Sequence, residues 1–222
     1  MTAILVAVTI VLFLGIDSLR LRRQRASVPA LAALPVAVRP EDFVVPAGLF
    51  LSPGHTWARL EPDGSLLVGV DDFATRILGR IDRLEVASQW AEVEREDAAV
   101  VLHQNRKSVA FAAPVEGTVT AINTEALLRP ARVRTDPYGA GWLLRLRPRR
   151  LASELRELRI GEEARGWLRD EVERLGEFLS RQIPADAVGA TLADGGLPVS
   201  DVLEQLDGTT WEAFEAEFLA SR

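Results

Sequence analysis

Cysteine is missing from the 222 residues of this chain. Its absence excludes disulfides, thiolate-ligated zinc, iron–sulfur clusters and cysteine nucleophiles together. Histidine occurs only as His55 and His103, which is too few for a histidine-rich metal site. Lysine occurs once, as Lys107, among 26 basic residues that are otherwise arginine. A glycine-rich phosphate loop and a recognisable acid-pair motif are also lacking, so the sequence offers little support for an enzyme and we expect no catalytic or metal-binding residues.

Charge is unevenly distributed along a chain of ordinary globular composition. Hydrophobic residues make up 48% and charged residues 26%, which indicates a folded protein with a core. Residues 1–150 carry 19 basic and 16 acidic groups, residues 151–222 carry 7 and 16, and the total net charge is -6. Because no stretch combines basic with aromatic residues, nucleic acid is not an expected partner.

The N-terminal segment is an apolar run followed by positive charge. Residues 3–16 (AILVAVTIVLFLGI) contain no charged side chain, and four arginines follow: Arg20, Arg22, Arg23 and Arg25. A helix over residues 2–19 would be roughly 27 Å long, near the lower limit for crossing a bilayer. The order of charges is opposite to that of a cleaved signal peptide. By the positive-inside rule, we expect residues 1–19 to be a transmembrane signal anchor and residues 20–222 to be cytoplasmic. A buried N-terminal helix is the alternative.

Composition divides the rest of the chain into three parts. Residues 20–48 are rich in arginine and then in proline and alanine, and we interpret them as a tether. Residues 49–150 hold short β-rich runs separated by turns, and residues 151–222 form an acidic helical extension. We therefore expect a mainly β protein with an N-terminal membrane helix and a C-terminal α-helical extension.

The β-rich runs are spaced as in an all-β sandwich or barrel. They comprise Thr56–Leu60, Ser65–Val70, Val100–Leu102, Val109–Ala113, Gly117–Ile122 and Trp142–Leu146. Residues 61–64 (EPDG) are typical of a hairpin turn, and Trp57 and Trp142 are expected in the core. One short helix is predicted over Asp71–Leu78.

Two helices are predicted in the extension. Apolar residues recur at steps of three and four between Ile160 and Leu179, which indicates one long amphipathic helix. A second helix is predicted over Asp201–Leu219, with Ser200 as its N-cap. Its aromatic face consists of Trp211, Phe214 and Phe218, which could bind a partner's groove or pack on the protein's own barrel.

Residues 50–150 resemble the H protein of the glycine cleavage system, a lipoyl-domain family. The resemblance rests on His55-Thr56-Trp57, Gly64, Val68-Gly69-Val70, Asp72-Phe73-Ala74, Leu78-Gly79, residues 113–119 (APVEGTV), Asn123 and residues 136–143 (DPYGAGWL). It implies a flattened β-barrel sandwich of two packed sheets. His55 lacks an accompanying catalytic motif, so we interpret it as a hydrogen-bonded structural residue rather than a general base.

The resemblance also implies where chemistry would occur. In that family, a lysine at the tip of a β-hairpin is amide-linked to lipoic acid, which carries an aminomethyl or acyl group between partner enzymes. Here the tip is expected at residues 103–108 (HQNRKS). Gapless counts from Gly79 and from Pro114 both place Arg106 at the family's lysine position, where a protonated guanidinium cannot be lipoylated. Lys107 follows one residue later and is the candidate lipoyl attachment site, and His103 replaces the family's acidic residue.

Two functions remain open. The favoured one is a membrane-anchored, non-enzymatic adaptor or subunit of a membrane-associated complex, without a cofactor. The alternative is a lipoylated carrier that uses Lys107 as the attachment of a swinging arm for a one-carbon or redox enzyme complex. The expected partners are the membrane, through residues 2–19, and a protein bound by the C-terminal helices or by the barrel surface.

Overall fold

The computed structural model describes residues 37–182, 192–193 and 197–219. The chain divides into the unit Met1–Pro35 and the compact unit Val36–Arg222, and the second unit holds all the described residues. The predicted anchor at residues 1–19 and most of the tether therefore lie outside the described residues. Within the described ranges, no helix is both long and apolar enough to cross a membrane.

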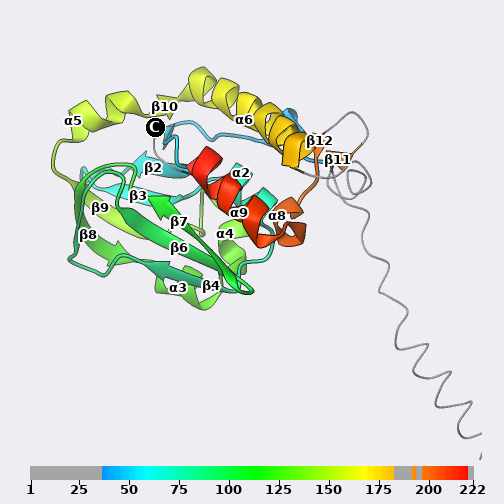
Figure 1. Cartoon of the computed structure of the whole chain (residues 1–222). Coiled ribbons are helices and arrows are strands. Elements are labelled where there is room, and N and C mark those ends of the chain that lie inside the picture. The colour runs from blue at the N-terminus through cyan, green and yellow to red at the C-terminus, as the bar shows by residue number, and fades with distance from the viewer. Residues whose placement is uncertain (1–36, 183–191, 194–196, 220–222) are drawn as a thin grey trace, which may run out of the picture. The chain divides into compact units, whose positions relative to one another are not determined.

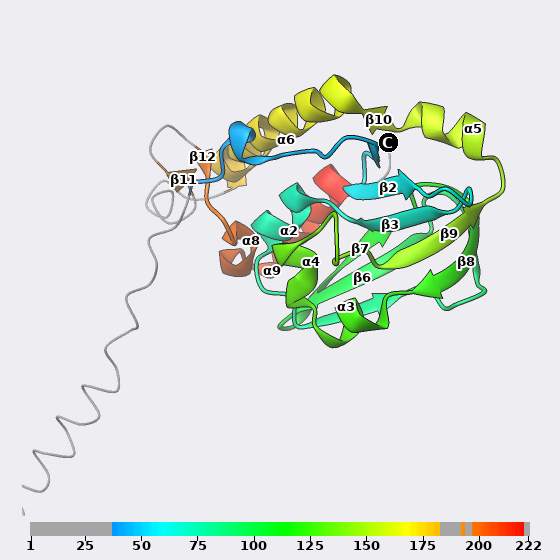
Figure 2. The same cartoon turned by 180° about the vertical axis from the view of Figure 1, so that it is seen from behind.

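Two antiparallel sheets form a flattened sandwich (Figures 1 and 2). The larger sheet has the strand order β10-β1-β2-β3-β9-β8-β5, and the smaller one has the order β4-β6-β7. Their bounds are β1 Leu49–Leu51, β2 Thr56–Leu60, β3 Leu66–Val70, β4 Arg83–Val86, β5 Glu92–Val93, β6 Ala98–Gln104, β7 Lys107–Ala112, β8 Gly117–Ile122, β9 Leu144–Pro148 and β10 Arg159–Ile160. The expectation of a mainly β sandwich is confirmed.

The first hairpin shows how the sequence specifies the sandwich. Gly64 adopts a φ of 79° in the turn between β2 and β3, a conformation that favours glycine. The register places Trp57 opposite Gly69, and a Cβ added to Gly69 would lie 2.8 Å from the indole. The Trp57 side chain is fully buried, and its Nε1 donates to the Val70 carbonyl at 3.1 Å. Trp142, expected in the core, is only partly buried.

Three short helices pack beside the sheets: α2 Asp72–Leu78, α3 Thr124–Leu128 and α4 Ala131–Thr135. The predicted helix is α2, and it begins one residue later than expected because Asp71 is its N-cap, with the carboxylate accepting from the Ala74 amide at 2.8 Å. Gly79 ends this helix with a φ of 83°.

The extension begins with α5 Leu151–Glu154 and the 3-10 turn η2 Leu155–Glu157, and continues after β10 into α6 Gly161–Gln182. The predicted amphipathic helix is therefore present as α6. Its buried face includes Leu168, Val172, Leu175 and Phe178, and it packs against β1. Residues 192–193 and 197–198 form the small antiparallel pair β11 and β12.

The second predicted helix is wrong as a continuous element. The chain forms α8 Val202–Gln205, α9 Gly208–Phe214 and the π-helical turn η3 Glu215–Leu219. Leu206 is extended at the end of α8, and the Asp207 side chain caps α9 by accepting from the Thr210 amide at 2.8 Å. The N-cap of α8 is Asp201 rather than Ser200, and its backbone is left-handed with no side-chain cap. We call residues 202–219 the strap.

The aromatic face of the strap is used within the molecule. Trp211, Phe214 and Phe218 are 3%, 1% and 2% exposed. Phe214 stacks on Phe218 at a centroid distance of 4.9 Å, and both rings meet Phe178 of α6 edge-on. Of the two alternatives for this face, packing inside the protein is the one observed, so this face is not free to dock a partner.

The end of the predicted tether also packs on the domain. Val38, Phe43 and Val45 are buried, around the 3-10 turn η1 Pro40–Asp42. Phe43 lies 5.8 Å from Phe73 of α2 between ring centroids. Burial of these apolar side chains ties residues 38–45 to the sandwich, so a free tether cannot extend to residue 48.

Candidate functional site

The β6–β7 hairpin ends in a two-residue turn. Gln104 pairs with Lys107 as the last step of the ladder, which leaves Asn105 and Arg106 to form the turn. Asn105 has a φ of 54°, which asparagine tolerates better than most residues. The predicted hairpin is thus present, and its tip is sharper than the six residues that the sequence indicated.

Hydrogen bonds from neighbouring loops fix this tip. The Asn105 amide donates to Asp82 Oδ2 at 2.6 Å, and Arg80 donates to Asn105 Oδ1 at 3.2 Å. Gln104 is buried, and its Nε2 donates to the carbonyls of Leu78 and Arg80. The hairpin therefore ends in a structured turn rather than in a loose loop.

Arg106 occupies the second position of the turn and is exposed. The nearby Arg80 and Arg83 pair with Asp82 and Glu85, whereas Arg106 has no ion pair within the described ranges. The guanidinium of Arg106 is thus presented to solvent without an ion-pair partner in the described part of the chain. This group is not acylated under biological conditions because it remains protonated.

Lys107 has a different environment, because its side chain meets the strap. Its Nζ donates to the Leu203 carbonyl at 3.3 Å and also to the Leu206 carbonyl. The ammonium lies 4.8 Å from the centre of the Trp211 ring, in cation–π geometry. Burial lowers the pKa of Lys107, and the nearby Asp207 carboxylate opposes this change. Lys107 is therefore partly buried and bound by the strap, whereas its neighbour Arg106 is exposed.

The strap contains the residues at this site that sequence reasoning missed. Glu204 accepts from the Arg80 amide at 2.6 Å and from Gln104 Nε2 at 3.2 Å, and Trp211 Nε1 donates to the Ser108 carbonyl at 3.4 Å. These partners lie about a hundred positions apart in the sequence, so no local pattern relates them. The one available signal was the spacing of the aromatic residues between 211 and 218, and it did not show which surface they would pack against.

His103 stands beside the tip, on β6. Its Nε2 lies 3.1 Å from an Arg83 guanidinium nitrogen and 3.3 Å from Glu85 Oε1. A partly exposed surface network of this kind neutralises charge locally. It provides neither a nucleophile nor a positioned base.

His55 belongs to a fully buried cluster between the sandwich and α6. Its ring stacks between Phe73 and Trp167 at centroid distances of 4.7 and 4.9 Å. Nδ1 lies 2.9 Å from Asp71, and Nε2 lies 3.7 Å from Glu171. Burial alone would lower the pKa of His55, but the Asp71 and Glu171 carboxylates raise it to about 9. His55 is therefore a hydrogen-bonded structural residue that links the extension to the barrel, as the sequence interpretation favoured, and the two carboxylates favour its charged form.

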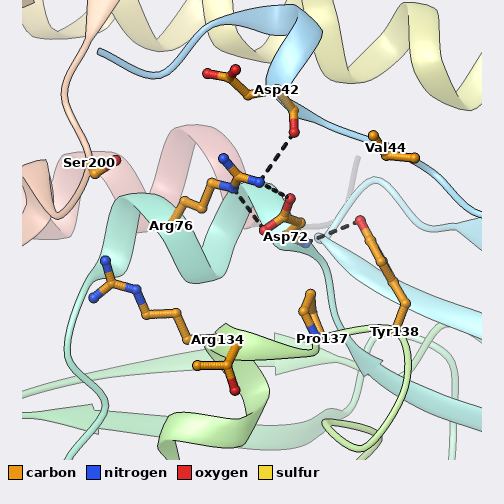
Figure 3. Close-up of a pocket in the computed structure, with 9 residues that line it drawn as sticks. Asp42, Val44, Asp72, Arg76, Arg134, Pro137, Tyr138 and Ser200 are labelled. Carbon is orange, nitrogen blue, oxygen red and sulfur yellow. Dashed lines mark hydrogen bonds and ion pairs between the residues drawn. The ribbon is translucent and has the colours of Figure 1, made fainter. Parts of the chain in front are cut away.

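A pocket of about 420 Å³ lies between α2, α4 and the strand-free segment after η1 (Figure 3). Asp72 pairs with Arg76 at 2.8 Å, and Arg76 also donates to the Asp42 carbonyl at 3.2 Å. The Tyr138 hydroxyl accepts from the Asp72 amide, and burial raises the pKa of this phenol. Because these polar groups already bind one another, they are less available to a ligand than the groups at the hairpin tip.

The matched family model describes the same region of the chain. The model of the glycine cleavage H-protein matches residues 49–171, which is more than half of the sequence. The match ends inside α6, so the strap lies outside it.

Individual relatives agree with the family model. A probable glycine cleavage system H protein from Pyrococcus horikoshii is 32% identical over 128 residues, covering 58% of this chain and 95% of the relative. The H protein of Alkalilimnicola ehrlichii is 38% identical over 104 residues, covering 47% of this chain and 80% of the relative. The crystal structure of the H protein from Mycobacterium marinum superposes with a TM-score of 0.50 at 26% identity, covering 55% of this chain and 98% of that one.

Proposed function

Because this chain belongs to the glycine cleavage H-protein family, whose members are non-catalytic carriers of lipoate, we propose that it is a non-enzymatic adaptor built on the carrier fold. The observation that carries this proposal is the difference in environment between two neighbouring side chains at the hairpin tip. Arg106 takes the exposed turn position, and Lys107 is bound by the strap. In this proposal the tip presents a permanent positive charge and carries no acyl group.

The chemistry of the two side chains supports an unlipoylated tip. A ligase needs an exposed amine that loses a proton when the amide forms. Arg106 has the exposure but retains its charge. Lys107 has the amine, but its nitrogen donates to the carbonyls of the strap.

The test is intact-mass measurement of the full chain produced together with lipoate and a lipoate ligase. We expect no lipoyl mass increment on the natural sequence. Arg106→Lys should gain the increment, because it places an amine at the exposed position, and Arg106→Gln is the control that should not. A lipoyl increment on the natural chain that is lost in Lys107→Arg would overturn the adaptor proposal.

The alternative function is a lipoylated carrier that uses Lys107. Its support is the membership of a lipoate-carrying family together with the lowered pKa of this amine, which increases the fraction that is unprotonated and nucleophilic. This function requires the strap to leave Lys107 during lipoylation.

We further propose that residues 2–19 anchor the protein in a membrane, with the remaining chain in the cytoplasm. The support is the uncharged run at residues 3–16 followed by four arginines within residues 20–25. After cell fractionation, the uncleaved chain should remain with membranes in carbonate at high pH. Recovery of the uncleaved chain in the soluble fraction would contradict this assignment.

A further inference from the structure

The strap runs beside β7, an edge strand of the smaller sheet (Figure 1). An edge strand presents unpaired backbone groups that can bind another chain or a modifying enzyme. Here Trp211 Nε1 donates to the Ser108 carbonyl of that edge at 3.4 Å, and η3 contacts β7 further along. The strap therefore occupies the side of the hairpin from which Lys107 projects.

Lys107 attaches the hairpin tip to the strap. Its ammonium reaches the carbonyls of Leu203 and Leu206, at the end of α8 where no further helical turn can satisfy them. The same ammonium lies over the Trp211 ring at 4.8 Å. Each of these contacts needs the charge or the donors of an unmodified amine.

Glu204 provides a second attachment. Its carboxylate accepts from the Arg80 amide at 2.6 Å and from Gln104 Nε2 at 3.2 Å. Glu204 itself is exposed, so its contacts can be removed without opening the core. The strap is thus attached at the tip by polar contacts and further along by its buried aromatic face.

We propose that the strap is an autoinhibitory cover, and that its docking on the hairpin and acylation of Lys107 exclude each other. This inference rests on the proposed function, because it explains how the only lysine of the chain stays unmodified. It concerns the regulation of the same tip and involves residues beyond the region that matches the family.

The chemistry makes the exclusion mutual. The ammonium first loses one proton to solvent. Nζ then forms a bond to the acyl carbon of an activated ester or adenylate, the leaving group departs with the electrons of its bond to that carbon, and a second proton is lost from nitrogen. The resulting amide is uncharged and keeps one N–H. It can no longer donate to both carbonyls, and the cation–π contact with Trp211 is lost. Because coupling between two equilibria is reciprocal, a docked strap makes acylation of Lys107 less favourable. Acylation is also slower, because Nζ is held by the strap carbonyls and only the undocked fraction presents a free amine.

The lone lysine makes the test direct. The full chain is treated with an N-hydroxysuccinimide acetyl ester, and acetylation of Lys107 is followed over time by peptide mass spectrometry, which separates it from the N-terminal amine. The control is the double variant Arg106→Lys/Lys107→Arg, whose only lysine is at the exposed turn position. We expect Lys107 to react about tenfold more slowly than the control lysine, since only the undocked fraction reacts.

Two variants open the strap. Trp211→Ala removes the ring under the ammonium, and Glu204→Ala removes the second attachment without touching the core. Both should accelerate acetylation of Lys107, and neither should accelerate it in the control background. If Lys107 in the natural chain reacts as fast as the control lysine, or if Glu204→Ala and Trp211→Ala both leave its rate unchanged, the cover does not exist.

Failure of the cover proposal can be distinguished from failure of the adaptor proposal. Fast acetylation of Lys107 without lipoylation in cells would overturn the cover and leave the adaptor proposal intact. Slow acetylation of Lys107 together with a lipoyl increment on the natural chain would overturn the adaptor proposal and retain the cover.

Discussion

The barrel and the strap are held in place by different kinds of contact. The barrel buries apolar side chains between two sheets, with Trp57 and Phe111 fully enclosed. The strap also buries aromatic rings, but at the hairpin tip it is attached by Lys107 and Glu204 through polar groups. The strap, which lies beyond the residues that match the family, thus binds side chains at the hairpin tip. The change of function that we propose requires no alteration of the barrel core.

The largest effect is expected from damage to the barrel. Trp57→Ala should lower the free energy of unfolding by about 3–5 kcal/mol, because it removes a fully buried indole and leaves a cavity. Trp90→Ala is the matched control, since this side chain is 67% exposed, and it should change stability by about 0.5 kcal/mol or less. Denaturant unfolding measures both. Equal losses in the two variants would show that the sandwich core is not where the barrel's stability lies.

The next effect concerns the buried cation between barrel and α6. The pKa of His55 is about 9 in the folded state and 6.5 as an ordinary value, so its contribution to stability is complete below pH 6.5 and is lost as pH rises through 9. The loss should be roughly 3 kcal/mol between these limits.

Thermal unfolding between pH 6 and pH 9.5 measures this loss. In Glu171→Gln, one carboxylate that raises the folded-state pKa of His55 is removed, so the decline should end at lower pH and be smaller. In His55→Phe the decline should disappear. If the pH dependence survived in His55→Phe, another group would be responsible.

The smallest effect is expected at the strap. Glu204→Ala should cost about 1 kcal/mol, since it removes hydrogen bonds between a carboxylate and two donors near the surface. Glu212→Ala is the control on the same segment, because Glu212 is exposed and makes no ion pair within the described ranges. A loss well above that of the control, in thermal unfolding, is the expected result. Identical values would show that the polar attachment contributes nothing to docking.

Local patterns predicted the elements whose signals are local. The EPDG turn, the capped helix α2 and the stripe of α6 follow from turn chemistry, capping and period. Strand β4 was missed because its four residues alternate polar with apolar over only two repeats, which is too short a pattern to stand out. The predicted continuous helix over 201–219 was wrong because Leu206 is extended and Asp207 caps a new helix.

The amino-acid order alone was enough to identify the family, the sandwich and the tip of the hairpin, since motifs and strand alternation lie in continuous segments. It also placed Arg106 at the lysine position of the family by counting. Which way Lys107 turns depended on the strap, whose residues follow it by about a hundred positions. Only the packing of the strap on β7 brings a cation to the open carbonyls of α8, because such contacts form between surfaces that meet on folding.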